Sequence, residues 1–279
     1  MTRCLTRAAT ALLLAASASV TSRAQVNQPR AAGQPPKILN VVHQSLIPGK
    51  GSDYTKLLDR IADTYDRGQI PVYWIESQSL TGPYEVMSLN FFGSFAEAEA
   101  VGNALVQATA SHPALGPMQE QLLGYVSAQT NAIAVRRDDL GYRANTIDFS
   151  RTHVLRVATI FVRQGYETEF AEAIRNLSTA YSKLNANAPW VTYQVNAGAP
   201  STTFFILLPM RSLTEMDDYI ARIAQLPAAE GDAVANRMQQ IARDAYRSWD
   251  SEIFIINPDI SHVSNEFAEG DPSFWRPRP

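Results

Sequence analysis

Two residues of this sequence could do acid–base chemistry at neutral pH. His43 lies in an apolar, β-branched run, and Glu76 stands two residues after a tryptophan in another such run. A neutral imidazole accepts a proton, and a carboxylate buried beside an aromatic ring has a raised pKa and can do the same. We therefore take His43 and Glu76 as candidate catalytic residues. The alternative for each is structural: a hydrogen-bonded strand histidine and an exposed carboxylate at a strand edge.

Tryptophan and glutamine recur at matching places in two strand-like runs. Trp74 and Gln78 share one face of the first run, and Trp190 and Gln194 share one face of the second. An indole can stack on an aromatic ligand while an amide hydrogen-bonds to it. The alternative is that the indoles cover the sheet and the amides are structural. The candidate ligand-binding residues are Trp74, Gln78, Asn90, Arg156, Trp190 and Gln194.

Several classes of site are excluded by what the sequence lacks. His43, His112, His153 and His262 are not spaced as metal ligands, and the one cysteine is Cys4. No Gly-rich phosphate loop and no G-x-S-x-G motif occurs. We therefore expect no metal and no cofactor. The formal charge of −3, without a basic stripe, argues against nucleic acid as a partner.

The first residues are typical of an export signal. Arg3 and Arg7 precede the apolar run 8–20, and Ser22-Arg23-Ala24 offers small residues for cleavage, with Ala18 as a second candidate. The run is shorter than the roughly 20 residues that span a bilayer. We expect residues 1–24 to be a signal peptide, residues 25–36 to be flexible, and the mature protein to be periplasmic or extracellular and free of the membrane.

A helical stripe appears twice in the chain. Apolar residues at i, i+3, i+4, i+7 and i+8 indicate one buried helix face. The first stripe is Tyr54, Leu57, Leu58, Ile61, Ala62 and Tyr65, and adding 116 to each position gives Phe170, Ala173, Ile174, Leu177, Ser178 and Tyr181. The same offset carries Trp74 to Trp190 and Gln78 to Gln194. The sequence therefore predicts one unit written twice in tandem.

Each unit is expected to run β-α-β-β-α-β, the order of a ferredoxin-like domain. The strands expected in the first are Ile38–Leu46, Val72–Ser79, Tyr84–Phe92 and Asn131–Arg136. Those expected in the second are His153–Val162, Trp190–Asn196, Thr203–Pro209 and Glu252–Ile256. Amphipathic helices are expected around Pro117–Ser127 and Asp232–Trp249, each ahead of a fourth strand.

The resulting organisation has two domains, a linker and a tail. Domain 1 covers residues 37–140, the linker 141–151, and domain 2 residues 152–257. The tail, residues 258–279, is either disordered or a strap docked over the domains. A ferredoxin-like sheet leaves one face bare, and such a face is normally covered by a partner. We expect the two domains to pack sheet to sheet.

This element order, the opening Ile47-Pro48-Gly49-Lys50-Gly51 before the first helix, and the duplication resemble the dimeric α+β barrel superfamily, which includes antibiotic-biosynthesis-monooxygenase-like and NIPSNAP-like domains. The resemblance implies an α+β fold in which the two units imitate a dimer within one chain. It also implies a cavity lined by a few polar and aromatic residues. Some members bind haem through a helical histidine, but none of the four histidines falls on an expected helix.

Three functions remain open at this point. The first is a module that binds a small, partly aromatic molecule. The second is an enzyme resembling cofactor-independent monooxygenases that act on phenolic or quinol substrates; its candidate groups include those at His43, Glu76, Asn90 and Arg156. The third is a structural or interaction protein without a ligand. Assembly into a homo-oligomer also remains open. We expect the two units to differ most where a site lies, as they do at His43 and Glu76.

Overall fold

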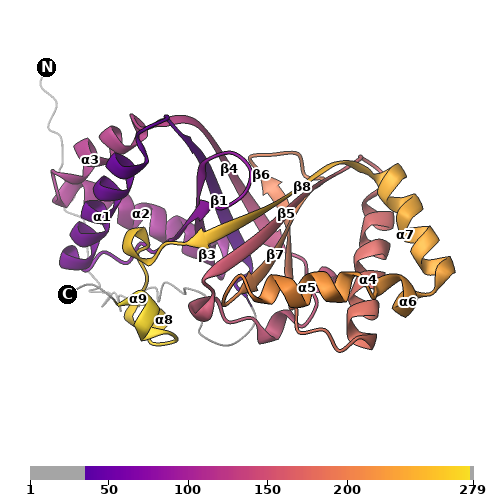
Figure 1. The fold of residues 1–279 in the computed structure, drawn as a ribbon. Helices are drawn as coiled ribbons and strands as arrows, with labels where there is room; N and C mark the ends of the chain where they lie inside the picture. Colours follow the sequence, from indigo (N-terminus) through magenta and orange to yellow (C-terminus); the bar gives the residue numbers. More distant parts are fainter. Residues whose placement is uncertain (1–34, 277–279) are drawn as a thin grey trace, which may run out of the picture.

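The fold was analysed in a computed structural model that describes residues 35–276. The expected signal peptide, residues 1–24, and most of the segment 25–36 lie outside this range. Within it, no helix is both long enough and apolar enough to cross a membrane. Figure 1 shows the strands gathered between two groups of helices, one at each side of the molecule.

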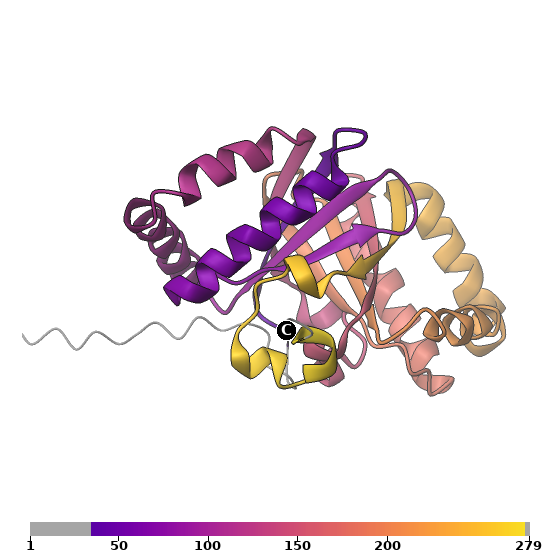
Figure 2. The ribbon, with the colours of Figure 1, turned by 60° about the vertical axis from the view of Figure 1, so that its left-hand side comes forward.

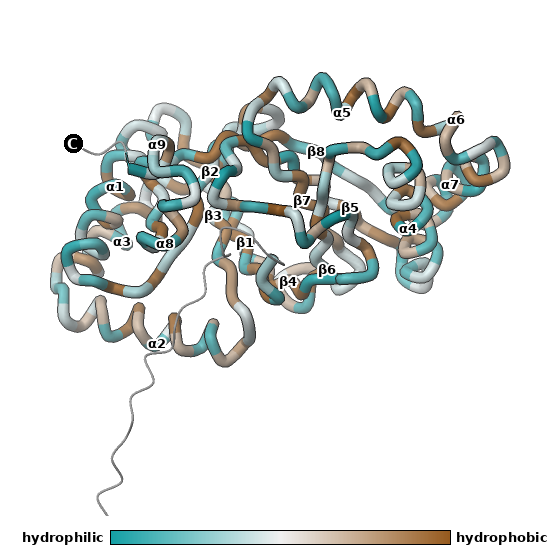
Figure 3. The backbone as a smooth tube through the Cα atoms, turned by 90° about the horizontal axis from the view of Figure 1, so that it is seen from below, coloured by the Kyte–Doolittle hydropathy of each residue, from teal (hydrophilic) through white to brown (hydrophobic). Residues whose placement is uncertain are grey.

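Eight antiparallel strands form one closed barrel. Around the barrel the order is β1-β3-β2-β8-β5-β7-β6-β4, and β4 returns to pair with β1. One set of apolar side chains fills the barrel, and a second set on the outer face packs under the helices. Figure 3 colours the backbone by hydropathy and shows hydrophobic residues along the strands. The strands are β1 Ile38–Leu46, β2 Ile75–Ser79, β3 Glu85–Phe92, β4 Val126–Arg136, β5 Val154–Val162, β6 Val191–Ala197, β7 Thr203–Met210 and β8 Tyr246–Ile256.

The two halves of the chain meet along two short seams. Strand β2 pairs with β8 from Ser77↔Ile256 to Ser79↔Phe254, and β4 pairs with β6 around Val135↔Gln194. The expected packing of one sheet onto the other therefore needs correction, because the sheets also join edge to edge by hydrogen bonds. Joining removes all four exposed strand edges, which would otherwise offer unpaired backbone groups.

The helices cover the outside of the barrel on two sides (Figure 1). Helix α1 buries Tyr54, Leu57, Leu58, Ile61, Ala62 and Tyr65, the stripe expected from the sequence. Helix α4 buries the matching Phe170, Ala173, Ile174 and Tyr181. The first half carries α1 Gly51–Gly68, α2 Phe95–Ser111 and α3 Leu115–Leu123; the second carries α4 Glu167–Lys183, α5 Glu215–Ile223, α6 Leu226–Glu230 and α7 Asp232–Ala245.

The fourth strand of each half begins earlier than expected. Strand β4 begins at Val126 and β8 at Tyr246, where the sequence predicted helix as far as residues 127 and 249. The reason is tertiary pairing: these polar segments complete hydrogen-bond ladders with β1 and β5, as at Ser45↔Ala128 and Phe161↔Ser248. The barrel wall therefore extends beyond the apolar core at this end.

The linker and the tail close the other end of the barrel. The linker contributes Ile147 and Phe149 to the barrel core, and the tail contributes Phe267 and Trp275. The Trp275 indole donates to the Ser150 carbonyl at 2.6 Å. Figure 2 shows the C-terminal segment folded back beneath the strands. Residues 258–276, the described part of the tail, are thus docked on the barrel and include α8 Asn265–Ala268 and α9 Pro272–Trp275.

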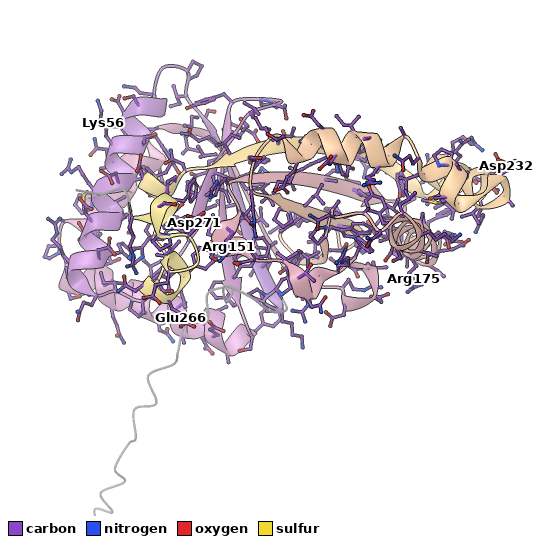
Figure 4. All side chains as sticks on the ribbon, turned by 60° about the horizontal axis from the view of Figure 1, so that its bottom comes forward. Lys56, Arg151, Arg175, Asp232, Glu266 and Asp271 are labelled. Atoms are coloured by element: carbon purple, nitrogen blue, oxygen red, sulfur yellow. The ribbon has the colours of Figure 1, made fainter. Side chains whose placement is uncertain are left out.

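Polar contacts fix the docked tail to the linker. Arg151 Nε donates to the Gly270 carbonyl at 3.1 Å, and Arg151 lies beside Asp271 in Figure 4. His153 stacks on Phe274 with a centroid distance of 3.9 Å, and its Nε2 lies 2.9 Å from Asp271 Oδ2. These contacts hold the apolar tail residues in the end of the barrel that the linker also closes.

Glu76 is buried between the barrel and α1. Its side chain points outward from β2, where Ser88 Oγ donates to Oε2 and the Tyr54 hydroxyl lies 3.4 Å from Oε1. The same hydroxyl donates to Gln44 Oε1 at 2.7 Å. Burial raises the pKa of Glu76 to about 7, although the hydrogen bonds from Ser88 and Tyr54 oppose this.

Gly198 is required where the β6–β7 turn crosses β4. Its φ of +92° is in the left-handed region, and an added methyl group would overlap the Asn131 carbonyl oxygen. We expect Gly198→Ala to lower the free energy of unfolding by at least about 2 kcal/mol, measured by urea denaturation. The control is Gly102→Ala on α2, where the added methyl group meets nothing within 4 Å. Equal stability of the two variants would contradict this reading.

Glu76 should make stability depend on pH. The folded protein holds the Glu76 proton more tightly than the unfolded chain, so stability is lost as pH rises from about 4.5 to about 7. Glu76→Gln should remove a loss on the order of 3 kcal/mol over this window, as followed by urea unfolding at a series of pH values. Glu99→Gln, on the exposed side of α2, is the matched control. Parallel curves for the wild type and Glu76→Gln would disprove the assignment.

Candidate functional site

A cavity of about 670 Å³ occupies the open end of the barrel. It lies opposite the linker and tail, where β1 and β5 end and where the extended β4 and β8 begin. The turns between β2 and β3 and between β6 and β7 form part of its rim. Its walls include Val41, His43, Glu85, Ala132, Thr159, Phe161, Thr203, Phe205, Asp250 and Glu252.

His43 is the imidazole of the cavity, on the inner face of β1. Its Nδ1 lies 3.6 Å from Glu85 Oε2, and Ser45 Oγ donates to Glu85 Oε1 at 2.8 Å. Burial lowers the pKa of His43, although the Glu85 carboxylate opposes this. The ring is therefore neutral near pH 7. With its proton on Nδ1, facing Glu85, its Nε2 can accept a proton from a bound molecule.

Carboxylates dominate one side of the cavity. Glu85 begins β3, while Asp250 and Glu252 lie on β8, across the seam. No Lys or Arg among residues 35–276 lines this cavity. Burial raises the pKa of Glu252, and the negative charges of Glu85 and Asp250 raise it further. Glu252 therefore lies close enough to the other two carboxylates to be affected by their charge.

The next strands around the barrel, β5 and β7, combine aromatic rings with hydroxyl groups. Phe161 and Phe205 come from β5 and β7, next to Thr159 and Thr203, and Thr159 pairs directly with Asp250. Thr203 is only 1% exposed, and its Oγ1 has no hydrogen-bond partner among the described residues. A buried hydroxyl without a partner costs about 1–3 kcal/mol.

The two halves contribute different chemistry at matching places. Thr159 and Phe161 stand 116 residues after His43 and Ser45, and Thr203 stands 118 residues after Glu85. One half therefore supplies an imidazole, a hydroxyl and a carboxylate where the other supplies two hydroxyls and a ring. Of the two candidate catalytic residues, His43 lines this cavity, and Glu76 lies outside the barrel under α1.

The two candidate tryptophans lie on the outer face of the barrel. Trp74 Nε1 donates to the Ile260 carbonyl at 2.8 Å, and Trp190 Nε1 donates to the Leu140 carbonyl at 2.9 Å. Each carbonyl belongs to a short 3₁₀ turn that follows the last strand of the opposite half: η4 Pro258–Ile260 and η1 Asp138–Leu140. Each indole therefore hydrogen-bonds its own half of the chain to the segment that follows the last strand of the other half.

The remaining candidate ligand-binding residues also lie outside the cavity. Gln194 accepts from Arg137 at 2.7 Å, and Asn90 donates to the Tyr73 carbonyl at 3.1 Å. The Arg156 guanidinium lies 4.9 Å from the centre of the Tyr219 ring. Gln78 lies on β2 at the seam, opposite Ile255.

Sequence reasoning missed Glu85, Thr203, Asp250 and Glu252. Alternation along the strands could have found two of them. Glu85 precedes Met87 at period two, and Glu252 precedes Phe254 in the same way, so each carboxylate shares the inward face of buried apolar residues. Asp250 falls in the part of β8 that was expected to follow a helix and lie outside the sheet. Nothing in the sequence marks the unpaired hydroxyl of Thr203.

The cavity does not fit haem or a metal ion. Haem carries two propionates, which would enter a mouth that already holds three carboxylates and, within residues 35–276, no Lys or Arg. No three His, Cys, Asp or Glu side chains of the described chain converge as metal ligands. His112, His153 and His262 lie elsewhere, bonded to Ala108, Asp271 and Asp66 respectively.

Comparison with known proteins shows the fold. No protein-family model and no curated protein sequence matches the chain. A solved structure of a candidate monooxygenase from Fusobacterium nucleatum is similar, with a TM-score of 0.51 and 11% identity over 80% of this chain and 93% of that one. A candidate monooxygenase from Lactobacillus acidophilus has a TM-score of 0.48, with 10% identity over 80% and 94%.

A haem-binding protein from Thermus thermophilus is more distant. Its TM-score is 0.43, with 9% identity over 84% of this chain and 96% of that one. Only the Fusobacterium protein exceeds 0.5 among these three, and at such identity it shows the fold alone. The α+β barrel expected from the sequence is therefore confirmed at the level of architecture: a mixed α+β chain around a closed, eight-stranded antiparallel barrel.

Proposed function

We propose that this protein binds a small, partly aromatic molecule in the open end of its barrel. The observation that carries the proposal is a cavity of about 670 Å³ at the open end of a barrel whose other end is packed with apolar side chains. Phe161 and Phe205 in its wall supply faces on which an aromatic ring can pack. A purely structural protein has no need of such a cavity, so the cavity argues against that role.

A second candidate function is a monooxygenase-like reaction that needs no cofactor. The neutral His43, held against Glu85, can take a proton from a phenolic or quinol hydroxyl. The resulting phenolate is electron-rich and can react with dioxygen. The Fusobacterium protein of similar fold is described as a candidate monooxygenase, which is compatible with this reaction.

Four further proposals concern the whole chain. The sequence of residues 1–24 supports export, with a periplasmic or extracellular location. The matching helix stripes and the offset of 116 support two ferredoxin-like units, residues 37–140 and 152–257, that arose by tandem duplication. NIPSNAP-like domains remain a proposed relative on the same ground. A homo-oligomer also remains a proposal.

Binding should be visible as a thermal shift. A ligand that binds only the native state raises the melting temperature, with a stabilisation that grows as the logarithm of 1 + [L]/Kd. A library of aromatic metabolites should therefore contain compounds that stabilise the wild type. Thr159→Trp places an indole inside the cavity and should abolish these shifts. Thr179→Trp, on the exposed side of α4, should preserve them. A library that stabilises neither the wild type nor the control variant would overturn the binding proposal.

The enzymatic alternative predicts oxygen uptake with quinol or anthrone-type substrates. His43→Gln removes the proton acceptor but keeps a hydrogen-bonding side chain, and the rate should fall by roughly 10²–10⁴-fold. Because the pKa of His43 is lowered, the wild-type rate should hold to a pH below the usual value for histidine. An oxygen electrode measures both effects. Folded wild type that consumes no oxygen with these substrates would rule the reaction out.

A further inference from the structure

We propose that the molecule bound in the barrel is a cation, with an ammonium or amidinium group attached to a flat apolar body. This rests on the proposed binding function and adds the chemical class of its ligand. Glu85, Asp250 and Glu252 would hold the positive group, and Phe161 and Phe205 would pack against the body.

The charge of the cavity selects the positive group. Glu85, Asp250 and Glu252 lie on neighbouring walls, and Glu252 contacts the turn at Gly82 that leads into β3. No Lys or Arg of the described chain forms an ion pair with these carboxylates, and their one cationic neighbour would be His43, which burial keeps neutral. An anion would be repelled, and a neutral molecule would leave the mutual repulsion of the carboxylates in place.

The spacing of the carboxylates selects an organic cation over a metal ion. Within residues 35–276, no group of three acidic or histidine side chains converges on one point. The carboxylates instead surround one side of a space of about 670 Å³, which lies in the range of small-molecule sites. Glu85 is already engaged by Ser45 and faces His43, so it is held in position ahead of binding.

The wall beside the carboxylates selects an apolar body. Phe161 lies on β5 and Phe205 on β7, the two strands that follow β8 around the barrel, and Thr159 on β5 pairs directly with Asp250. The rings therefore lie next to the acidic side chains within one cavity. A flat apolar body can pack against the rings while its positive group meets the carboxylates.

Matched compounds of different charge test this inference. One set is tyramine, 4-ethylphenol and 4-hydroxyphenylacetate, and the other is tryptamine, 3-ethylindole and indole-3-acetate. Within each set the ring is constant and the side chain is cationic, neutral or anionic near pH 7. Isothermal titration with the full chain should show the amine binding at least about tenfold more tightly than its neutral analogue, with added salt weakening only the amine.

Charge-removing variants locate the positive group. Glu252→Gln and Asp250→Asn should each weaken amine binding by about tenfold and leave the neutral analogue unchanged, while Glu99→Gln should change neither. If wild-type protein binds the three members of a set equally, or prefers the acid, the proposal of a cationic ligand is wrong. The proposal that the cavity binds a small molecule would still stand. Wild-type protein that binds none of the six compounds, in a screen where other aromatic molecules also fail, would overturn the binding function and the cation together.

Discussion

Closure of the barrel by two short seams is the constraint on which the rest of this structure depends. At one seam only Ser77, Gln78 and Ser79 of β2 pair with β8, and at the other the ladder between β4 and β6 shifts register at Ile133. Such short ladders contribute little by themselves. They hold because the barrel core, the linker and the tail bring the two sheets together from inside and from one end. Once the seams are made, the chain encloses a space in which one end is filled and the other is open.

The architecture was largely predictable because it follows from periodicity. The six buried residues of α1 are those of the expected stripe, and their counterparts on α4 lie 116 residues later. Strand positions near the core were also predictable, since β-branched and aromatic residues mark them. Pairing across the seams was not, because the sequences of Ser77–Ser79 and Phe254–Ile256 do not specify each other. Only the closed arrangement brings them into register.

The site was less predictable than the fold, and the reasons differ by residue. Trp74 and Trp190 attracted attention because they persist in both halves, yet each bonds to the backbone of a turn and serves packing. The two halves differ at His43 and at Glu76. The structure places His43 in the wall of the cavity and Glu76 outside the barrel, under α1. Asp250 escaped because the polar start of β8 lacks apolar alternation, so the expected helix ran to Trp249 and the expected strand began only at Glu252.

The tryptophan of each half bonds to a turn that follows the last strand of the other half, and this has a consequence for the order of folding. The Trp74 indole, near the start of the described chain, donates its hydrogen bond to the carbonyl of Ile260, which follows all eight strands in the sequence. The first half therefore cannot complete its own surface while the chain is being synthesised. It must wait, with the edge of β2 exposed, until β8 and the tail arrive. A chaperone that shields an open strand edge would act on this protein during that interval, and the interval ends only when the last strand is in place.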